Sequence, residues 1–220
     1  MSAAGASETA NDFAATVRRL RRRLAEELPG RAAQARLAPG SRATPPGAAS
    51  PEGHDCREAG VLVLLYPQQQ SRRPMLVLTE RRAHLDDHAG QVSFPGGQRE
   101  ASESLQQTAL REAHEEIALA RETVEVLGPL TPLYIPPSNY CVHPFIGVAE
   151  PAPSLTPADA EVAALLHVPL ADLRAPEALA RERWTLSGGR SVEVPFYDVD
   201  GRPPIWGATS MILAELLALF

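Results

Sequence analysis

The chain contains no lysine, and all 21 of its basic residues are arginines. This absence excludes Schiff-base catalysis by a lysine and the phosphate-binding lysine of P-loop proteins. Any cationic contact to a phosphate must therefore come from an arginine, a histidine or the N-terminus. The formal net charge of -6 also argues against a protein that binds nucleic acid by general electrostatic attraction, so we expect no nucleic-acid partner.

Cysteines and long apolar runs are also scarce. Cys56 and Cys141 lack the spacing of a metal site and allow one bridge at most. No apolar run reaches the ~20 residues that a membrane-spanning helix needs, so we expect no membrane partner. The opening residues are small and polar, without the basic start and apolar core of a secretory signal. A reducing cytoplasm is therefore the expected location.

Periodicity and composition divide the chain into three parts. Residues 1–30 contain Phe13, Val17 and Leu20 at helical spacing among arginines, which predicts an N-terminal amphipathic helix. Residues 31–57 are rich in Pro, Ala and Gly and predict a flexible linker without stable structure. Residues 58–220 alternate expected strands with two or three helices, which indicates an α/β domain.

An acidic array lies between Gly97 and Leu119, where the sequence reads Gly-x5-Glu-x7-Arg-Glu-Ala-His-Glu-Glu-Ile-Ala-Leu. A helix advances about 100° per residue, so Glu112, Glu115 and Glu116 fall on one arc and can present their carboxylates to a common point. These like charges repel each other, and a hard divalent cation such as Mg²⁺ would remove that cost. For the three glutamates alone, a solvated acidic face is the alternative, but the spacing from Gly97 argues against it.

The residues that begin and end this expected helix carry their own signals. Ser104 and Gln107 predict a capping box at its start. The whole segment resembles the Nudix box, Gly-x5-Glu-x7-Arg-Glu-φ-x-Glu-Glu-x-Gly-φ, where φ is aliphatic. Only Ala118 departs from the fixed positions, because the family has a glycine there. A left-handed residue is often needed at that point, so the alanine predicts a different helix ending.

The resemblance implies a three-layer α/β/α sandwich with a mixed β-sheet, a Mg²⁺ or Mn²⁺ cofactor, and metal-assisted attack of water on a diphosphate. It assigns metal-ligand positions to Glu112, Glu116, Glu115, Gly97 and Glu103. Arg111 would orient the glutamates, because it lies one helical turn before Glu115. Glu112 is the first choice for the general base. Glu161 is the alternative, since members of the family also recruit a base from a later loop; an ordinary charge at a strand edge explains Glu161 equally well.

A second motif precedes the box. The stretch from Val77 to Gly97 resembles Leu-Leu-Thr-x-Arg-Ser-x3-Arg-x3-Gly-x3-Phe-Pro-Gly-Gly, which marks the coenzyme A pyrophosphatases among Nudix proteins. The resemblance implies coenzyme A or acyl-CoA as substrate, cut to 3′,5′-ADP and (acyl-)4′-phosphopantetheine. Its substrate-binding positions fall on Arg81, Arg82 and Gly96. Proteins similar to this one are often homodimers, so a homodimer is the expected assembly.

One departure keeps other substrates open. Asp86 stands where this motif has its second arginine, and a carboxylate repels the phosphate that an arginine would bind. A Nudix hydrolase of ADP-ribose, a dinucleotide or another nucleoside diphosphate derivative is therefore the first alternative. The second is a regulatory Nudix module that binds nucleotide without cleaving it. The intact glutamates Glu112, Glu115 and Glu116 argue against that module.

Overall fold

The computed structural model describes residues 12–40, 50–82, 90–158, 161–185, 189, 191–199 and 201–220. Asp86 therefore lies outside the described residues. The helices, with short 3₁₀ turns labelled η, are α2 (Phe13–Leu24), α3 (Gly30–Gln34), η1 (Ala35–Leu37), α4 (Leu105–Ile117), η3 (Arg121–Thr123), α5 (Leu170–Arg174), η4 (Pro176–Ala178) and α6 (Gly207–Leu217). The strands are β1 (Arg57–Pro67), β2 (Pro74–Arg81), β3 (Val92–Ser93), β4 (Gly96–Gln98), β5 (Val124–Pro129), β6 (Leu133–Ile135), β7 (Tyr140–Ala149), β8 (Val162–Pro169), β9 (Leu179–Thr185), β10 (Ser191–Tyr197) and β11 (Ile205–Trp206).

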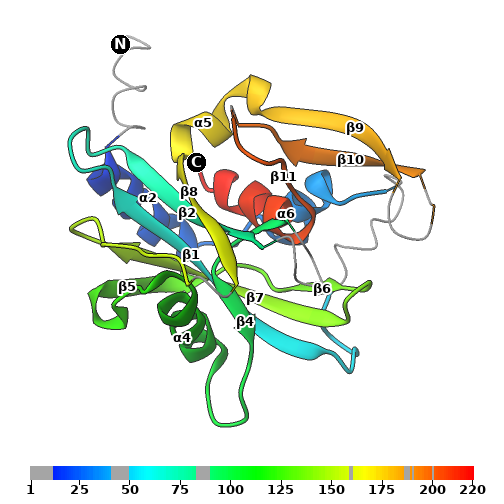
Figure 1. Ribbon diagram of the computed structural model, residues 1–220, viewed down its shortest axis with the longest axis horizontal. Coiled ribbons are helices and arrows are strands. Elements are labelled where there is room, and N and C mark those ends of the chain that lie inside the picture. Colours follow the sequence, from blue (N-terminus) through cyan, green and yellow to red (C-terminus); the bar gives the residue numbers. More distant parts are fainter. Residues whose placement is uncertain are drawn as a thin grey trace.

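A mixed eight-stranded sheet forms the centre of the molecule (Figure 1). Its main order is β3-β2-β1-β7-β5, while β4 pairs with β1, β6 with β7 and β8 with β2. β1 and β7 run parallel, and the other pairs are antiparallel. A second sheet, β11-β10-β9, lies beyond α6. The expected α/β class with a mixed sheet is confirmed.

The alternation of side chains along β1 explains the layers. Successive residues of a strand point to opposite faces. Leu62 and Leu64 belong to the apolar cluster under α4, whereas Val63 and Leu65 belong to the cluster that includes α2 and α6. All four side chains are completely buried, and each such burial contributes about 2 kcal/mol. One strand thus supplies two cores, and helices cover both faces of the sheet (Figure 1).

The expected N-terminal helix is confirmed as α2. Asp12 caps it by accepting a hydrogen bond from the amide of Ala15 at 3.2 Å. Phe13, Val17 and Leu20 are buried against the domain, so the apolar stripe read from the sequence is a packing face. In the part of the chain that the structure describes, no helix is long and apolar enough to cross a membrane.

The expectation of a linker without stable structure was wrong for its first residues, which form α3 and η1. The carboxylate of Glu215 on α6 is fully buried and accepts hydrogen bonds from four groups. These donors are the side-chain amide of Gln34 at 2.8 Å, the amide of Gly30 at 3.2 Å, and the hydroxyl and amide of Thr131 at 2.6 and 3.2 Å. A buried carboxylate is tolerated only when it is hydrogen-bonded, so these contacts fix the segment to the domain. Local composition cannot indicate a partner 181 residues away.

Candidate active site

The helix α4 begins and ends at defined caps. Ser104 accepts a hydrogen bond from the amide of Gln107 at 3.3 Å, and the Gln107 side chain accepts one from the amide of Ser104 at 2.8 Å. The expected capping box is therefore confirmed. The expectation of a different helix ending was wrong, because Ala118 adopts the left-handed conformation with φ 53°. The conformation that glycine usually supplies costs alanine about 1–2 kcal/mol.

Two glycines let α4 approach the sheet closely. Gly60 on β1 and Gly97 on β4 are partners in the antiparallel register. A Cβ atom on Gly60 would lie 2.2 Å from the carbonyl oxygen of Leu105, and a Cβ atom on Gly97 would lie 2.5 Å from the carboxyl carbon of Glu112. The Glu112 carboxylate therefore rests directly on the backbone of β4, in space that only glycine leaves open.

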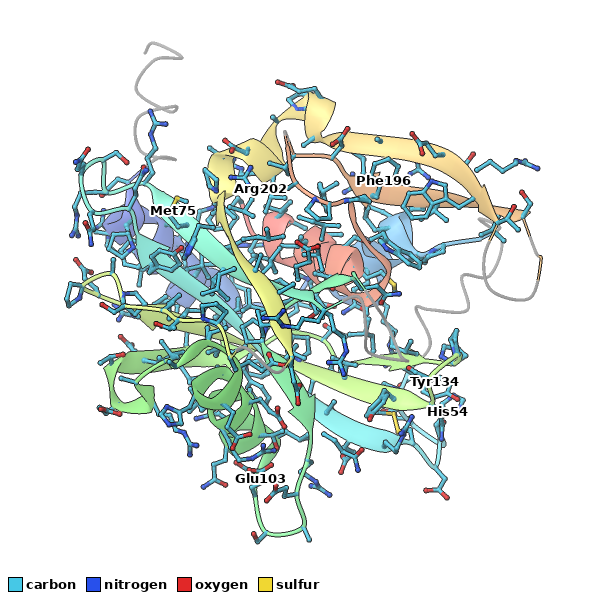
Figure 2. The ribbon with its side chains drawn as sticks, viewed as in Figure 1. His54, Met75, Glu103, Tyr134, Phe196 and Arg202 are labelled. Atoms are coloured by element: carbon cyan, nitrogen blue, oxygen red, sulfur yellow. A yellow bond between two sulfur atoms is a disulfide. The ribbon has the colours of Figure 1, made fainter. Side chains whose placement is uncertain are left out.

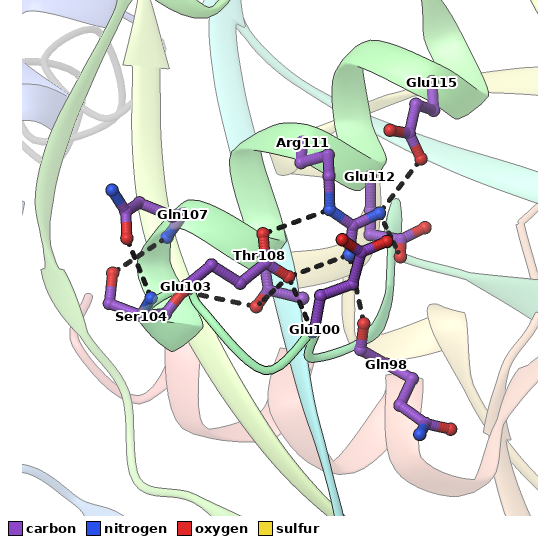
Figure 3. A network of polar contacts seen from close by, with 9 residues as sticks. All are labelled: Gln98, Glu100, Glu103, Ser104, Gln107, Thr108, Arg111, Glu112 and Glu115. Atoms are coloured by element: carbon purple, nitrogen blue, oxygen red, sulfur yellow. Dashed lines mark hydrogen bonds and ion pairs between the residues drawn. The ribbon is translucent and has the colours of Figure 1, made fainter.

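Arg111 organises the acidic side chains of α4 (Figure 3). Its Nε and Nη2 donate to the two carboxylate oxygens of Glu103 at 3.1 and 2.9 Å. Its Nη1 lies 3.0 Å from Glu115 and 2.8 Å from Glu112. Its Nη2 also donates to the carbonyl oxygen of Gln98 at 3.1 Å. One guanidinium thus joins three of the expected glutamates to β4, and the contact with Glu115 follows from the helical spacing.

Two partners of this network were missed in the sequence. The buried hydroxyl of Thr108 donates to Glu103 at 2.9 Å, and the carbonyl of Gln98 accepts from Arg111 (Figure 3). The hydrogen bonds from Arg111 are the main cause that lowers the pKa of Glu103 to about 2, and Glu103 in turn raises the pKa of Arg111. Thr108 lies one helical turn before Arg111, so its i,i+3 spacing was an available signal.

A second group of charges lies at the C-terminal end of α4. Glu116 accepts a hydrogen bond from the amide of Gly96 at 3.2 Å. Burial raises the pKa of Glu116 to about 8, and the negative charges of Glu112 and Glu161 add to this shift. Burial also raises the pKa of Glu112. Arg81 lies 3.8 Å from Glu161 and partly offsets the charge near Glu116. Residues from β2, β4, α4 and the start of β8 therefore meet here.

Not every expected residue joins this group in the same way. Glu115 forms an ion pair with Arg111, and its side chain is 53% exposed. The sequence predicted that Glu112, Glu115 and Glu116 point to one place, but the Glu115 carboxylate does not join the other two there in the same way. Arg82 reaches the group through its main chain, since its amide donates to the carbonyl of Glu161 at 3.0 Å.

The acidic group supplies carboxylate oxygens, but these oxygens are not already arranged around a metal position. Among the described residues, no three acidic, histidine or cysteine side chains form a group that could hold a metal ion. The oxygens of Glu112 and Glu116 instead face Arg111 and the amide of Gly96. Their chemistry nevertheless fits a hard divalent cation, because two partly buried carboxylates with raised pKa values gain from a nearby positive charge.

The comparison with known proteins agrees with this geometry. A family model described as "NUDIX domain" matches residues 57–187 of the chain. The chain belongs to the Nudix family. A protein called "Uncharacterized Nudix hydrolase NudL" from Photorhabdus laumondii is 40% identical over 158 residues, which cover 70% of this chain and 81% of the relative. A protein of the same name from Citrobacter koseri is 36% identical over 162 residues, which cover 73% and 81%.

Solved Nudix structures are more distant. The crystal structure of a Nudix hydrolase from M. smegmatis, RenU, has a TM-score of 0.46 and 24% sequence identity, over 54% of this chain and 73% of that chain. The family and its hydrolase class therefore rest on the domain match and the NudL relatives, and on these grounds the chain is a Nudix hydrolase. Membership in the coenzyme A pyrophosphatase subfamily stays a prediction.

Proposed function

We propose that this Nudix hydrolase cleaves the diphosphate bond of coenzyme A or acyl-CoA, giving 3′,5′-ADP and (acyl-)4′-phosphopantetheine. The observation that carries the proposal is the meeting of Glu112 and Glu116 with Gly96 and Arg81. The glutamates come from the Nudix box, and the glycine and arginine come from the motif typical of coenzyme A pyrophosphatases. Contact between residues of the two motifs supports the proposal, because one substrate would have to meet both.

The carboxylates of Glu112 and Glu116 would hold Mg²⁺ or Mn²⁺, with the carbonyl of Gly97 beside them. Glu115 would serve as a further or water-mediated ligand, and Glu103 as an outer one that also fixes Arg111. When bound, the cation neutralises phosphate charge and lowers the pKa of the attacking water.

The side chains of the site then have separate tasks. Arg111 positions Glu112 against β4, since Glu103 and the carbonyl of Gln98 fix its guanidinium. Glu112 is the first choice to accept the proton of the attacking water, because its carboxylate lies in the middle of the site, between Arg111 and the backbone of Gly97. Glu161 is the alternative base, and its 56% exposed side chain at the start of β8 can turn toward the site.

The substrate side of the site is cationic. The side chain of Arg81 is 37% exposed at the end of β2, where its guanidinium can meet a phosphate. Arg82 follows directly, and the amide of Gly96 already donates to a carboxylate oxygen. Asp86 favours the second candidate, which is hydrolysis of ADP-ribose, a dinucleotide or another nucleoside diphosphate derivative.

The test is a product assay with coenzyme A and ADP-ribose side by side, in Mg²⁺ or Mn²⁺, read by mass spectrometry. Release of 3′,5′-ADP that EDTA abolishes supports the proposal. Hydrolysis of ADP-ribose alone keeps the Nudix chemistry and overturns the substrate. Nucleotide binding without turnover of either compound would favour the regulatory module.

The residue assignments have their own test. Glu112→Gln and Glu116→Gln each remove an ionised oxygen ligand, so we expect kcat to fall by roughly a hundredfold or more, as when other charge-stabilising groups are removed from active sites. Glu122→Gln is the matched control, because Glu122 is exposed on η3. Turnover that survives both site variants would contradict the metal assignment.

A further inference from the structure

A disulfide joins the starts of two neighbouring strands. Cys56, directly before β1, is bonded to Cys141 near the start of β7, with a Cα–Cα distance of 5.8 Å and a sequence separation of 85. The two strands run parallel, so the bond links their first residues at one edge of the molecule. Cys141 is 1% exposed, whereas Cys56 is partly exposed. The sulfur of Cys56 is therefore the one that a soluble thiol can reach.

The residues next to the two cysteines contact each other. The guanidinium carbon of Arg57 lies 4.2 Å from the ring centre of Tyr140. Arg57 also donates from its side chain to the carbonyl of Ser138 at 2.7 Å, and from its amide to the carbonyl of Asn139 at 3.0 Å. The disulfide thus lies beside a set of contacts between the segment before β1 and the turn before β7.

Ring stacking adds to this edge. The rings of His54 and Tyr134 stack with their centres 3.8 Å apart, and Figure 2 shows the two residues together at the edge that carries the disulfide. His54 is exposed and belongs to the segment that Cys56 anchors. The side-chain amide of Asn139 also donates to the carbonyl of Asp55 at 3.1 Å, so the covalent bond and a few polar contacts together hold this segment.

The same edge reaches the candidate active site in two hydrogen bonds. The hydroxyl of Tyr140 donates to the side-chain oxygen of Gln98 at 3.1 Å. The carbonyl of Gln98 accepts from Nη2 of Arg111, also at 3.1 Å. Gln98 directly follows Gly97, on which the Glu112 carboxylate rests. The neighbour of Cys141 is therefore connected to the arginine that orders the catalytic helix.

We propose that the Cys56–Cys141 disulfide is a thiol-controlled clamp on this site, closed and active when oxidised, and opened by a dithiol reductant. The proposal rests on the proposed diphosphatase function. Cys56 is partly exposed, so a dithiol can reach one sulfur of the bond. Accessible disulfides are the labile and regulatory ones, whereas fully buried ones act as permanent cross-links.

The opening reaction is ordinary thiol–disulfide exchange. A thiolate of the reductant attacks the sulfur of Cys56, the bond between the two protein sulfurs breaks, and Cys141 leaves as a thiolate that takes up a proton. The second thiol of the reductant then attacks the mixed disulfide and releases Cys56. The protein gains two electrons and two protons, and the reductant becomes a disulfide.

Reduction removes the covalent restraint on residues 54–57. Arg57 and Tyr140 stay ladder partners in β1 and β7, but their side-chain contact and the hydrogen bond from Tyr140 to Gln98 become easier to break. We expect kcat/KM to fall at least threefold in the reduced protein, because Arg111 is less firmly held against β4.

The experiment compares the full chain in its oxidised form and after dithiothreitol, with free thiols counted by alkylation and mass spectrometry. Amide hydrogen exchange is measured on peptides that cover residues 54–57, 96–99 and 138–141, and turnover is measured on the same samples. The variant with Cys56→Ser and Cys141→Ser is the control, because it cannot close and should not respond to dithiothreitol.

The clamp predicts faster exchange in all three peptides after reduction, lower turnover, and recovery on reoxidation. The double variant should match the reduced protein. Unchanged exchange at 96–99 in protein with two verified thiols overturns the proposal, and so does unchanged turnover. Absence of turnover in both redox states is a failure of the proposed function instead, and exchange at 96–99 then still decides whether the disulfide restrains β4.

Discussion

Replacing Glu116 by glutamine should stabilise the metal-free protein while it removes activity. Glu116 is partly buried beside Glu112 and Glu161, and loss of solvent and these negative charges raise its pKa to about 8. The native state therefore holds a proton on this carboxyl far more tightly than the unfolded state does. Glutamine is neutral at every pH and keeps an oxygen that can accept the hydrogen bond from Gly96.

The magnitude follows from proton linkage. The pKa of Glu116 rises from an ordinary value of 4.5 to about 8, and each unit corresponds to about 1.36 kcal/mol. Because the native pKa is the higher one, the stabilising contribution is complete below the unfolded pKa and is lost as pH rises through the native pKa. Between pH 5 and pH 8, the free energy of unfolding should fall by at most about 3.5 kcal/mol. The variant should lack this fall.

The assay is urea unfolding at pH 5 and pH 8 in EDTA, for the wild type and Glu116→Gln. At pH 5 the two should be similar. At pH 8 the variant should be more stable by up to about 3.5 kcal/mol, or about 7–14 °C in Tm. Added Mg²⁺ should stabilise the wild type more than the variant, because under the proposed metal assignment the cation would bind the ionised carboxylates of the native state.

Glu122→Gln is again the control, and it should follow the wild type at both pH values. A wild-type stability that does not change between pH 5 and pH 8 would show that Glu116 is not held in an unfavourable charged state. The reasoning would also fail if Glu116→Gln were less stable than the wild type at pH 8. Either result would mean that solvent reaches this carboxylate.

Three further predictions concern backbone positions and the disulfide. Ala118→Gly should raise the free energy of unfolding by about 1 kcal/mol with kcat unchanged, since glycine adopts the left-handed conformation without strain; urea unfolding measures this, and a loss of stability would contradict it. Gly97→Ala should lower kcat about a hundredfold in a folded protein, because the new Cβ displaces the flexible carboxylate of Glu112. Gly60→Ala should lower the free energy of unfolding by roughly 3 kcal/mol or more, because its Cβ meets the backbone of α4. Activity and circular dichroism on both variants separate the two effects, and an active Gly97→Ala would refute the close packing. Reduction of Cys56–Cys141 should lower the free energy of unfolding by up to about 4–5 kcal/mol, from the loop entropy of a separation of 85 residues; equal unfolding midpoints with and without dithiothreitol would exclude this.

Much of the site could be inferred before the fold was known. The spacing of Arg111 and Glu115 places them on one side of a helix, and the contact between these side chains follows that spacing. The capping box at Ser104 is also a local pattern. Such features are accessible because helix geometry depends on residues three and four apart, and neighbours at that distance are written directly in the sequence.

The helix ending shows where a local rule was insufficient. Ala118 predicts a departure from the glycine ending, yet the chain adopts the same left-handed turn. The amide of Leu119 and that of Ala118 both donate to the carbonyl of Ala113, and Leu119 is fully buried. Burial of the next side chain thus outweighs a strain of about 1–2 kcal/mol.

By itself the sequence determined the family, the acidic helix and the α/β class, because these depend on short spacings and on periodicity. Only the tertiary structure decided that Glu116 lies next to Glu161, that Glu215 fixes the segment after α2, and that Cys56 bonds to Cys141. These contacts join residues that are far apart in the chain. Their formation depends on which strands become neighbours in the sheet, and that order is set by the burial of both faces of β1 rather than by any local pattern.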